Sequence, residues 1–438
     1  MLIYSFLEQL QVNNQDKYCL IYAQEKLTYR QLAEKVNAVA KRLTIKEQNK
    51  VLIKFANPLT QLIYLLAIAK TGGICVFAPS DISDDICEQL TKKHDIVATL
   101  SENNLALSNE EKSVLPLITD QTIFLGALTS GTTGMPKIIL RQHQSWTSAF
   151  NSQSKLFNLS STDNLYLVGS LSYTANLNAC LHMLSIGGTV VLAVNHLPKS
   201  WLNDIACYDI TAIFMVPANL RVLLKVVKQP LDAIRSISTT GAKMDVMTAE
   251  KLLHYFPKAT ICEYYGASEL GHVTYILVQD TLSKPLSVGK AFPGVKLSVQ
   301  DGVIWVQSPY LAYEYQPQAT VGDLGQIDDE GYLFLQGRKN GIINVAGVKV
   351  IPTQIELIIK ECRGVADVVV SGIKDTIKGE KICAWIVKDN QALQTSDIKN
   401  FCRQNMPKQC CPQKIVFVEN MPLNGNGKVD YKRLAEIQ

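Results

Sequence analysis

Apolar positions recur with helical and strand spacing along the first quarter of the chain. Gln31 follows Thr28 by three residues, and apolar residues then recur at helical intervals, which predicts a capped amphipathic helix. Three further elements are expected, an apolar strand, a helix and a buried strand: residues 51–55, 59–70 and 74–78. The chain therefore opens with alternating helices and strands.

The same alternation continues through the middle of the chain. Strands are expected at residues 189–193, 212–216, 234–239 and 260–264, with helical stretches such as 244–255 between them. This order predicts an α/β fold with mainly parallel strands. Ligands bind beyond the carboxyl ends of strands in such folds, which is where Gly241 and Tyr265 are expected to lie.

The pattern changes after Gly337 to a compact unit of small-domain size. Its expected strands are residues 365–370, 382–387 and 415–418, and its expected helices are 354–361 and 396–405. We place the boundary at residues 338–341. The sequence thus predicts a large N-terminal α/β domain over residues 1–338 and a small α+β domain over residues 339–438.

Composition narrows the class of protein. The chain has 438 residues, of which 47% are hydrophobic, enough to fill two sizeable cores. A net charge of +4 and no basic run interleaved with aromatic residues argue against nucleic acid. We expect no membrane span and no secretion signal, hence a cytoplasmic protein. The 11 cysteines lack Cys-x-x-Cys spacing, so neither a disulfide framework nor a zinc site is expected.

A run of small hydroxyl residues and glycines at positions 129–137 carries the first chemical signal. It reads Thr-Ser-Gly-Thr-Thr-Gly-Met-Pro-Lys, between apolar segments at residues 124–128 and 138–140 that predict a pair of strands. Glycines allow backbone N–H groups to converge on an anion, and hydroxyls add donors. The segment is therefore interpreted as a phosphate-binding hairpin tip, with a flexible linker as the alternative. It departs from the P-loop pattern, because Met135 and Pro136 precede Lys137.

With this segment and four others in the same order, the chain resembles the adenylate-forming enzymes. That family includes acyl- and aryl-CoA synthetases, adenylation domains of peptide synthetases, and luciferase. The other matching segments are Tyr-Tyr-Gly-Ala-Ser-Glu at residues 264–269, Gly322-Asp323, Gly337-Arg338 and Gly427-Lys428. The resemblance covers nearly the whole chain. It implies a large domain and a small mobile C-terminal domain.

The resemblance also assigns an ATP site. It implies that Thr129 and Glu269 are catalytic, that Glu269 holds Mg²⁺, and that Tyr265 lies against adenine. Asp323 and Arg338 would contact the ribose, although an isolated Gly-Asp-x-Gly more often shapes a turn. The remaining expected ATP contacts are Ser130, Gly131, Thr132, Thr133, Gly134, Lys137, Gly241, Ala242, Gly266 and Ser268.

Three residues of the small domain receive roles by the same resemblance. Lys428 would reach the substrate carboxylate and the phosphate, although a lysine in a glycine-rich turn is by itself more often only solvated. Gly347 would line a thiol tunnel used in the second half-reaction. Asn340 stands where the family usually has Asp or Lys as the hinge.

The acid to be activated is inferred from the segment at residues 169–178. Tyr173 stands where many members have histidine or another aromatic residue, and no aspartate is present to pair with an α-ammonium. An unpaired buried ammonium is costly, so an α-amino acid is disfavoured. Tyr173, Phe214, Met215 and Val216 instead predict an apolar pocket for a fatty or aromatic acid.

The expected activity is ATP-dependent formation of an acyl-adenylate, followed by transfer to the thiol of CoA. The required small molecules are ATP, Mg²⁺, the acid and CoA. One alternative acceptor is the phosphopantetheine arm of an acyl carrier protein. A non-catalytic nucleotide-binding relative is the other alternative, which Asp323, Glu269 and Lys428 argue against.

Overall fold

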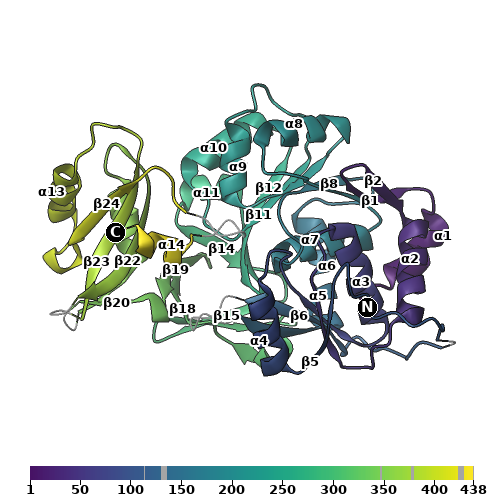
Figure 1. Cartoon of the computed structure of the whole chain (residues 1–438). Coiled ribbons are helices and arrows are strands. Elements are labelled where there is room, and N and C mark those ends of the chain that lie inside the picture. The colour runs from purple at the N-terminus through teal and green to yellow at the C-terminus, as the bar shows by residue number, and fades with distance from the viewer. Residues whose placement is uncertain (113, 130–135, 346–347, 376–378, 423–428, 438) are drawn as a thin grey trace. The chain divides into compact units, whose positions relative to one another are not determined.

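The computed structural model (Figure 1) describes residues 1–112, 114–129, 136–345, 348–375, 379–422 and 429–437. The chain forms two compact units. The larger unit comprises Met1–Lys296 and Val306–Ala319, and the smaller one comprises Leu297–Trp305 and Thr320–Gln438. The domain boundary expected between residues 338 and 339 stays a prediction.

The larger unit is built on a sheet with the strand order β14-β13-β12-β11-β10-β8-β9-β1-β2. From β12 through β11, β10, β8 and β9 to β1 all neighbours are parallel, whereas β2, β13 and β14 run antiparallel to theirs. This confirms the expected α/β fold. The strands are β1 (Tyr18–Tyr22), β2 (Glu25–Thr28), β8 (Asn164–Leu167), β9 (Thr189–Leu192), β10 (Ala212–Phe214), β11 (Ser236–Thr240), β12 (Thr260–Ala267), β13 (Gly271–Leu277) and β14 (Ser287–Ala291).

A second sheet of the larger unit has the order β5-β3-β4-β6-β7. Its strands are β3 (Lys50–Ile53), β4 (Ile74–Phe77), β5 (Ile96–Leu100), β6 (Ile123–Thr129) and β7 (Lys137–Gln142). All pairs are parallel except β6 and β7, which are antiparallel neighbours in space and in sequence. The strand pair expected around the glycine-rich segment is thus confirmed.

Several helices of the larger unit begin at a side-chain cap or a proline. The helices of this unit are α1 (Phe6–Asn13), α2 (Tyr29–Arg42), α3 (Pro58–Lys70), α4 (Asp84–His94), α5 (His143–Thr147), α6 (Phe150–Leu156), α7 (Thr174–Ser185), α8 (Pro198–Cys207), α9 (Pro217–Leu224), α10 (Val246–Tyr255) and α11 (Val278–Ser283). Thr28 and Gln31 form the predicted capping box of α2. The strand expected at 212–216 ends early, because Val216 is the N-cap of α9 and Pro217 begins that helix.

The two faces of the parallel sheet are covered by different helices. Alternate residues such as Ile213, Ile237 and Ile261 point into a hydrophobic core with α8, α9 and α10, and these helices lie together beside β11 and β12 in Figure 1. The opposite face, which includes Phe214 and Tyr264, meets α6 and α7.

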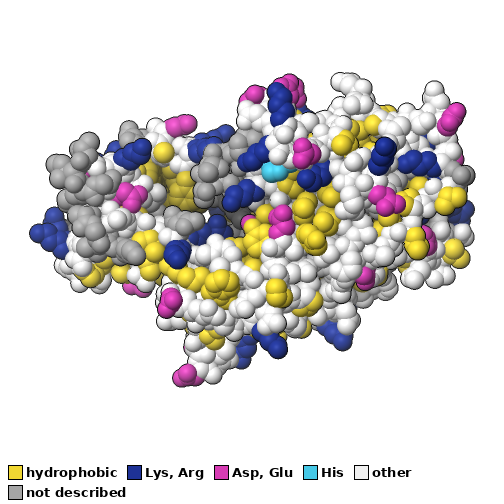
Figure 2. All heavy atoms as spheres, turned by 90° about the horizontal axis from the view of Figure 1, so that it is seen from below, with side chains coloured by type: hydrophobic (Ala, Val, Ile, Leu, Met, Phe, Trp, Pro, Cys, Tyr) yellow, Lys and Arg dark blue, Asp and Glu magenta, His cyan; other side chains and the backbone are white. Residues whose placement is uncertain are grey.

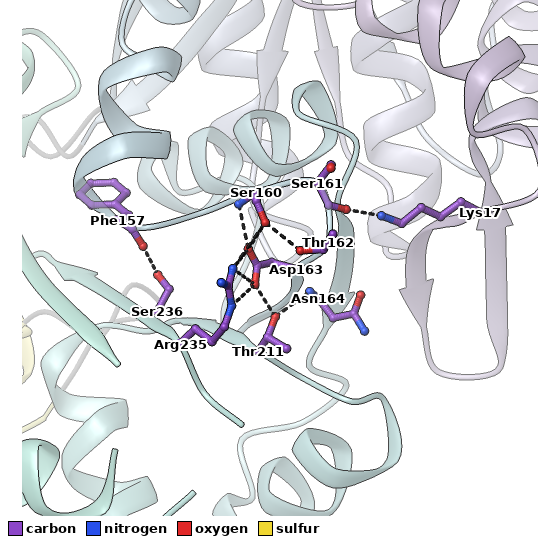
Figure 3. A network of polar contacts seen from close by, with 10 residues as sticks. All are labelled: Lys17, Phe157, Ser160, Ser161, Thr162, Asp163, Asn164, Thr211, Arg235 and Ser236. Atoms are coloured by element: carbon purple, nitrogen blue, oxygen red, sulfur yellow. Dashed lines mark hydrogen bonds and ion pairs between the residues drawn. The ribbon is translucent and has the colours of Figure 1, made fainter. Parts of the chain in front are cut away.

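A buried carboxylate ties together the amino ends of three parallel strands (Figure 3). Asp163 precedes β8, and both of its oxygens accept hydrogen bonds from Arg235, which precedes β11, at 2.7 and 2.8 Å. Thr211, which precedes β10, donates to Asp163 at 2.7 Å, and Ser160 donates its backbone N–H and its hydroxyl. The network lies at the edge of the sheet remote from the strands' carboxyl ends.

The smaller unit contains a mixed five-stranded sheet, with β23 paired to β22, β20 and β24. Its strands β20 (Ile343–Val345), β21 (Val348–Val350), β22 (Val365–Asp375), β23 (Gly379–Lys388) and β24 (Lys414–Val418) accompany helices α12 (Pro352–Lys360), α13 (Thr395–Asn405) and α14 (Tyr431–Glu436). Additional strands of this part of the chain are β15 (Lys296–Gln300), β16 (Val303–Gln307), β18 (Asp323–Ile327) and β19 (Leu333–Arg338). Every strand and helix expected after Gly337 is present, which confirms a small α+β unit.

The described surface is mixed in charge. On the face drawn in Figure 2, basic and acidic side chains are interspersed and hydrophobic side chains lie between them. None of the helices in the described parts of the chain combines the length and the apolar character that crossing a membrane requires.

Candidate active site

The hairpin of β6 and β7 places two predicted phosphate ligands side by side. Thr129 ends β6 and is directly paired with Lys137, which begins β7. Ser130, Gly131, Thr132, Thr133 and Gly134 lie outside the described residues. The described strands therefore confirm that the glycine-rich segment joins two antiparallel strands, and its contacts with phosphate stay a prediction.

Gly241 forms a tight turn after β11, where the adenine site is expected. Its φ of +97° favours glycine, and a Cβ there would lie 3.2 Å from the hydroxyl of Tyr173 and 3.6 Å from a methyl group of Val216. The structure thus brings together an expected ATP contact and two expected pocket residues. Gly241 directly follows β11, at the carboxyl end of a parallel strand, as the sequence predicts.

A buried ion pair holds this turn against β12. Glu263 accepts hydrogen bonds from the Lys243 ammonium at 2.9 Å and from the Met244 backbone N–H at 3.2 Å. Burial raises the pKa of Glu263, and Lys243 opposes that shift. Ala242, another expected ATP contact, lies between Gly241 and Lys243 and is positioned by the same pair.

The two tyrosines at the end of β12 have different surroundings. Tyr264 is buried and stacks on Phe157 and His272, with ring centroids 5.7 and 4.5 Å apart. Tyr265 points to the other face and is partly exposed. Gly266 follows in a tight hairpin, where a Cβ would lie 2.3 Å from the Gly271 carbonyl oxygen. Of the pair, Tyr264 is therefore a core residue, and Tyr265 keeps the ring that could stack on a base.

The loop after β12 carries Ser268 and Glu269, the residues expected near phosphate and Mg²⁺. The hydroxyl of Ser268 lies 3.0 Å from that of Thr174, the first residue of α7. The Glu269 carbonyl oxygen accepts a hydrogen bond from the Ala312 N–H at 2.8 Å. Both predicted residues are partly exposed, so their side chains are accessible from solvent.

Arg141, near the end of β7, anchors the same loop and was not identified from the sequence. Its guanidinium donates to the backbone oxygens of Ser268 at 2.7 Å, Tyr310 at 2.8 Å and Ser145 at 2.9 Å. Burial lowers its pKa to about 10, and Glu269 opposes the shift. The available sequence signal was a lone arginine inside an apolar strand, where a charge needs compensating partners.

The donors near this loop fit Mg²⁺ better than a transition metal. No cluster of three His, Cys, Asp or Glu side chains suited to a metal ion occurs in the described part of the chain. Mg²⁺ prefers oxygen ligands and is usually held by one or two carboxylates together with water and substrate phosphates. One carboxylate at Glu269 with a neighbouring hydroxyl at Ser268 is consistent with such binding.

Three of the four residues expected in the acyl pocket lie apart from the core on the opposite sheet face, and one lies in that core. Phe214 faces a small cavity on the side of the sheet covered by α6 and α7, while Tyr173 and Val216 lie beside Gly241. Met215 packs instead in the hydrophobic core on the opposite face, because successive residues near a strand end point to opposite sides. The inclusion of Met215 among the pocket residues was therefore wrong.

Within the smaller unit, the two expected ribose ligands are paired. Asp323 begins β18 and Arg338 ends β19, where they are directly opposite each other. The Arg338 Nε–H donates to Asp323 at 2.8 Å, and the carboxylate is largely buried while the arginine is exposed. The structure thus brings these two residues together. Lys428 and Gly347 lie outside the described residues, as does the side chain of Asn340.

Family models and relatives with known names both match this chain along most of its length. The family model described as AMP-binding enzyme matches residues 6–127 and 105–315, and the model described as AMP-binding enzyme C-terminal domain matches residues 354–428. A putative long chain fatty acid-CoA ligase, VraA, of Staphylococcus epidermidis is 29% identical over 434 residues, covering 95% of this chain and 94% of that protein. An uncharacterized acyl-CoA ligase, YhfT, of Bacillus subtilis is 30% identical over 369 residues, covering 80% and 75%.

The fold is similar to that of solved enzymes. The o-succinylbenzoate CoA synthetase of Bacillus subtilis, solved with its acyl-adenylate intermediate, aligns with a TM-score of 0.84 at 20% identity, covering 98% of this chain and 97% of that one. A second structure of that enzyme, in complex with ATP and a magnesium ion, also aligns with a TM-score of 0.84.

Proposed function

Because the chain belongs to the AMP-binding enzyme family, we propose that it activates an apolar carboxylic acid with ATP and transfers the acyl group to CoA. It is an acid–thiol ligase that forms an acyl-adenylate intermediate. The observation that carries the proposal is the convergence of Gly241, Tyr173 and Val216 at the carboxyl ends of the parallel strands. The relatives named acyl-CoA ligases support CoA as the acceptor.

The reaction has two balanced steps. A carboxylate oxygen of the acid attacks the α-phosphorus of ATP, and pyrophosphate leaves. The CoA thiolate then attacks the acyl carbonyl, and AMP leaves with the electron pair of the broken C–O bond. Neither step needs an oxidant or reductant, so the protein contributes mainly positioning and charge neutralisation.

Different residues are proposed to bind the adenine, the phosphates, the ribose and Mg²⁺. Tyr265 and the Gly241–Ala242 turn hold adenine, Thr129 and Lys137 flank the phosphate segment, and Asp323 with Arg338 holds the ribose. Glu269 and Ser268 would hold Mg²⁺, which supplies charge neutralisation of the phosphates when bound. A similar synthetase was solved in complex with ATP and a magnesium ion, which supports ATP and Mg²⁺ as the bound small molecules.

The acid is proposed to be apolar near its carboxyl group. The segment 169–178 provides no aspartate for an α-ammonium, and Tyr173, Phe214 and Val216 offer aromatic and aliphatic surface. The relatives' names include a putative long chain fatty acid-CoA ligase and an o-succinylbenzoate synthetase, which support a carboxylic acid of either fatty or aryl type.

The test is pyrophosphate release by the purified full-length protein across straight-chain, aryl and α-amino acids, with and without CoA. We expect ATP–pyrophosphate exchange with apolar acids, and acyl-CoA formation when CoA is added. Exchange with a common amino acid and none with fatty or aryl acids would overturn the substrate proposal. Adenylation without any CoA thioester would favour a carrier-protein phosphopantetheine as the acceptor.

A further inference from the structure

A small recess lies on the sheet face that α6 and α7 cover. Its volume is about 10 Å³, roughly the space that one polar atom or one water needs. Leu165, Phe214, Ser238 and Tyr264 line it from β8, β10, β11 and β12, and Gln153, Phe157, Leu159, Ala179 and His182 complete it. The recess belongs to the same face as Phe214, a residue expected in the acyl pocket.

One wall of this recess is polar and incompletely hydrogen-bonded. Gln153 on α6 is only 2% exposed, and its Nε2 lies 2.6 Å from Asn178 Oδ1 and 3.1 Å from His272 Nε2. Its Oε1 is buried without a hydrogen-bond partner among the described residues. A buried acceptor that lacks a donor is unfavourable, so this oxygen is suited to receive a hydrogen bond from a ligand.

The recess carries no charge that would select an ion. None of the residues that line it is an aspartate, glutamate, lysine or arginine. Burial lowers the pKa of both His182 and His272 to about 3, so both imidazoles are neutral at neutral pH. Arg141, the buried cation near His272, is committed to three backbone oxygens elsewhere. A neutral donor group therefore fits the recess better than a carboxylate or an ammonium.

One face of α7 connects the recess with the loop that carries Ser268. The helix begins at Thr174, whose hydroxyl contacts that of Ser268. Ala175, Ala179 and His182 follow at intervals of four and three residues and so share one face of the helix. Ala175 and Ala179 are partly exposed, unlike the buried His182. At 1.5 Å per residue, the path from Ala175 to His182 is about 10 Å long.

We propose that the recess receives the distal end of the acyl group, and that the preferred acid carries a neutral hydrogen-bond donor, such as a hydroxyl, about 10 Å from its carboxylate. The donor hydrogen-bonds to Gln153 Oε1. In this proposal the apolar part of the chain runs along the partly exposed Ala175 and Ala179 toward Phe214 and Tyr264, which line the recess. This inference rests on the proposed acid activation and specifies the class of acid.

The first test uses the unaltered full-length protein and matched acids. Straight-chain acids from hexanoic to dodecanoic are compared with ω-hydroxy acids of the same heavy-atom count, with pyrophosphate release as the readout. We expect kcat/KM to favour the hydroxy acid by at least about tenfold at the chain length that reaches Gln153, because a site built to bond a hydroxyl rejects its apolar analogue.

The second test removes the proposed hydrogen-bond acceptor. Gln153→Met keeps the length of the side chain and removes the acceptor, so the hydroxyl-to-methyl ratio should fall to about one while the apolar acid is still used. Gln61→Met is the matched control. Gln61 lies on α3, outside the recess; like Gln153 it is buried, and its side chain donates to the backbone oxygen of Phe55. The control should leave the ratio unchanged.

The results distinguish failure of this inference from failure of the proposed function. A preference for the apolar acid at every chain length, or an unchanged ratio in a well-folded Gln153→Met variant, overturns the inference and leaves a recess that holds only water. If Gln153→Met fails to fold, the selectivity of the unaltered protein decides by itself. Failure to release pyrophosphate with any acid, hydroxylated or not, overturns the proposed function and this inference with it.

Discussion

At the scale of single residues, Arg141 has the least ordinary environment in the candidate site. It is a buried cation whose three hydrogen bonds all go to backbone oxygens, and one of these belongs to Ser268. A planar guanidinium directs donors on separate nitrogens along fixed directions, whereas the three donors of an ammonium rotate about one nitrogen. Arg141 is therefore a positioning residue for the loop that presents Glu269.

We expect Arg141→Lys to lower kcat for adenylation by about tenfold or more, since small displacements of positioned groups reduce rates steeply. The rate should also need a higher Mg²⁺ concentration, because the loop carries the expected Mg²⁺ ligand. Arg42→Lys is the control, since Arg42 also donates to a backbone oxygen, that of Ser108. A Mg²⁺ dependence identical to that of the unaltered protein would contradict the positioning role.

Asp323 should affect ATP much more than the acid. Its carboxylate is proposed to accept hydrogen bonds from both ribose hydroxyls, and hydrogen bonds to charged groups contribute about 1.5–3 kcal/mol each. Asp323→Ala should therefore raise KM for ATP and leave KM for the acid nearly unchanged. Arg338→Ala tests whether the partner at 2.8 Å orients this carboxylate. Equal increases in both KM values would mean that Asp323 only supports the strand pair.

The sequence identified residues whose chemistry is local and missed those whose role depends on distant contacts. Gly241 and Tyr265 were predicted at strand ends, and the structure places them there. Arg141 is 127 residues from Ser268 along the chain, and Gln153 is 119 residues from His272. No local periodicity reports such contacts, because they arise only when helices pack on the sheet.

At the scale of elements, Asp163 fixes the amino ends of β8, β10 and β11. Burial disfavours its charged form, but hydrogen bonds from Arg235, Thr211 and Ser160 outweigh burial and lower the pKa of Asp163. A carboxyl group with a lowered pKa stabilises the fold above its unfolded pKa. That contribution is lost as the pH falls through the folded-state pKa.

We expect Asp163→Asn to lower the free energy of unfolding by about 1–3 kcal/mol at neutral pH, because it removes a buried charged acceptor. The difference from the unaltered protein should shrink at acidic pH, where Asp163 itself becomes protonated. Urea unfolding at several pH values measures both effects. Asp232→Asn breaks the exposed pair with Lys258 and should change stability little. A loss that is independent of pH would contradict this account.

Strand and helix periodicity predicted most elements but not the exact end of β10. The apolar run at 212–216 was interpreted as one strand, and the strand stops at Phe214. Val216 and Pro217 obey the rules of a helix start, with proline at the first position. Hydrophobicity alone could not separate an apolar strand from the apolar start of a helix.

At the scale of the whole molecule, the two units carry different parts of the proposed chemistry. The larger unit contains Glu269, Tyr265 and the recess, whereas Asp323, Arg338 and Lys428 belong to the smaller one. We propose that the two half-reactions use different arrangements of these units. Sequence patterns indicated two domains, but they do not report which arrangement serves which step.

Lys428 provides the sharpest test of such alternation. If its ammonium neutralises the carboxylate and the α-phosphate only during adenylation, Lys428→Ala should slow pyrophosphate release by at least about 10²-fold, as loss of one preorganised charge-stabilising donor does. Transfer from supplied acyl-adenylate to CoA should survive, because that step needs no charge neutralisation at the triphosphate. Single-turnover thioester formation from synthetic acyl-adenylate, measured beside pyrophosphate release from ATP, separates the two steps.

Lys432→Ala is the matched control for this experiment, since Lys432 is an exposed lysine four positions away on α14. It removes the same charge and should leave both half-reactions intact. The melting curves of both variants must match that of the unaltered protein. If Lys428→Ala slows both half-reactions together in a well-folded protein, then Lys428 serves both steps, and the proposed alternation does not operate here. If only adenylation slows, the lysine acts in one arrangement, and the smaller unit must take another before the thiol attacks.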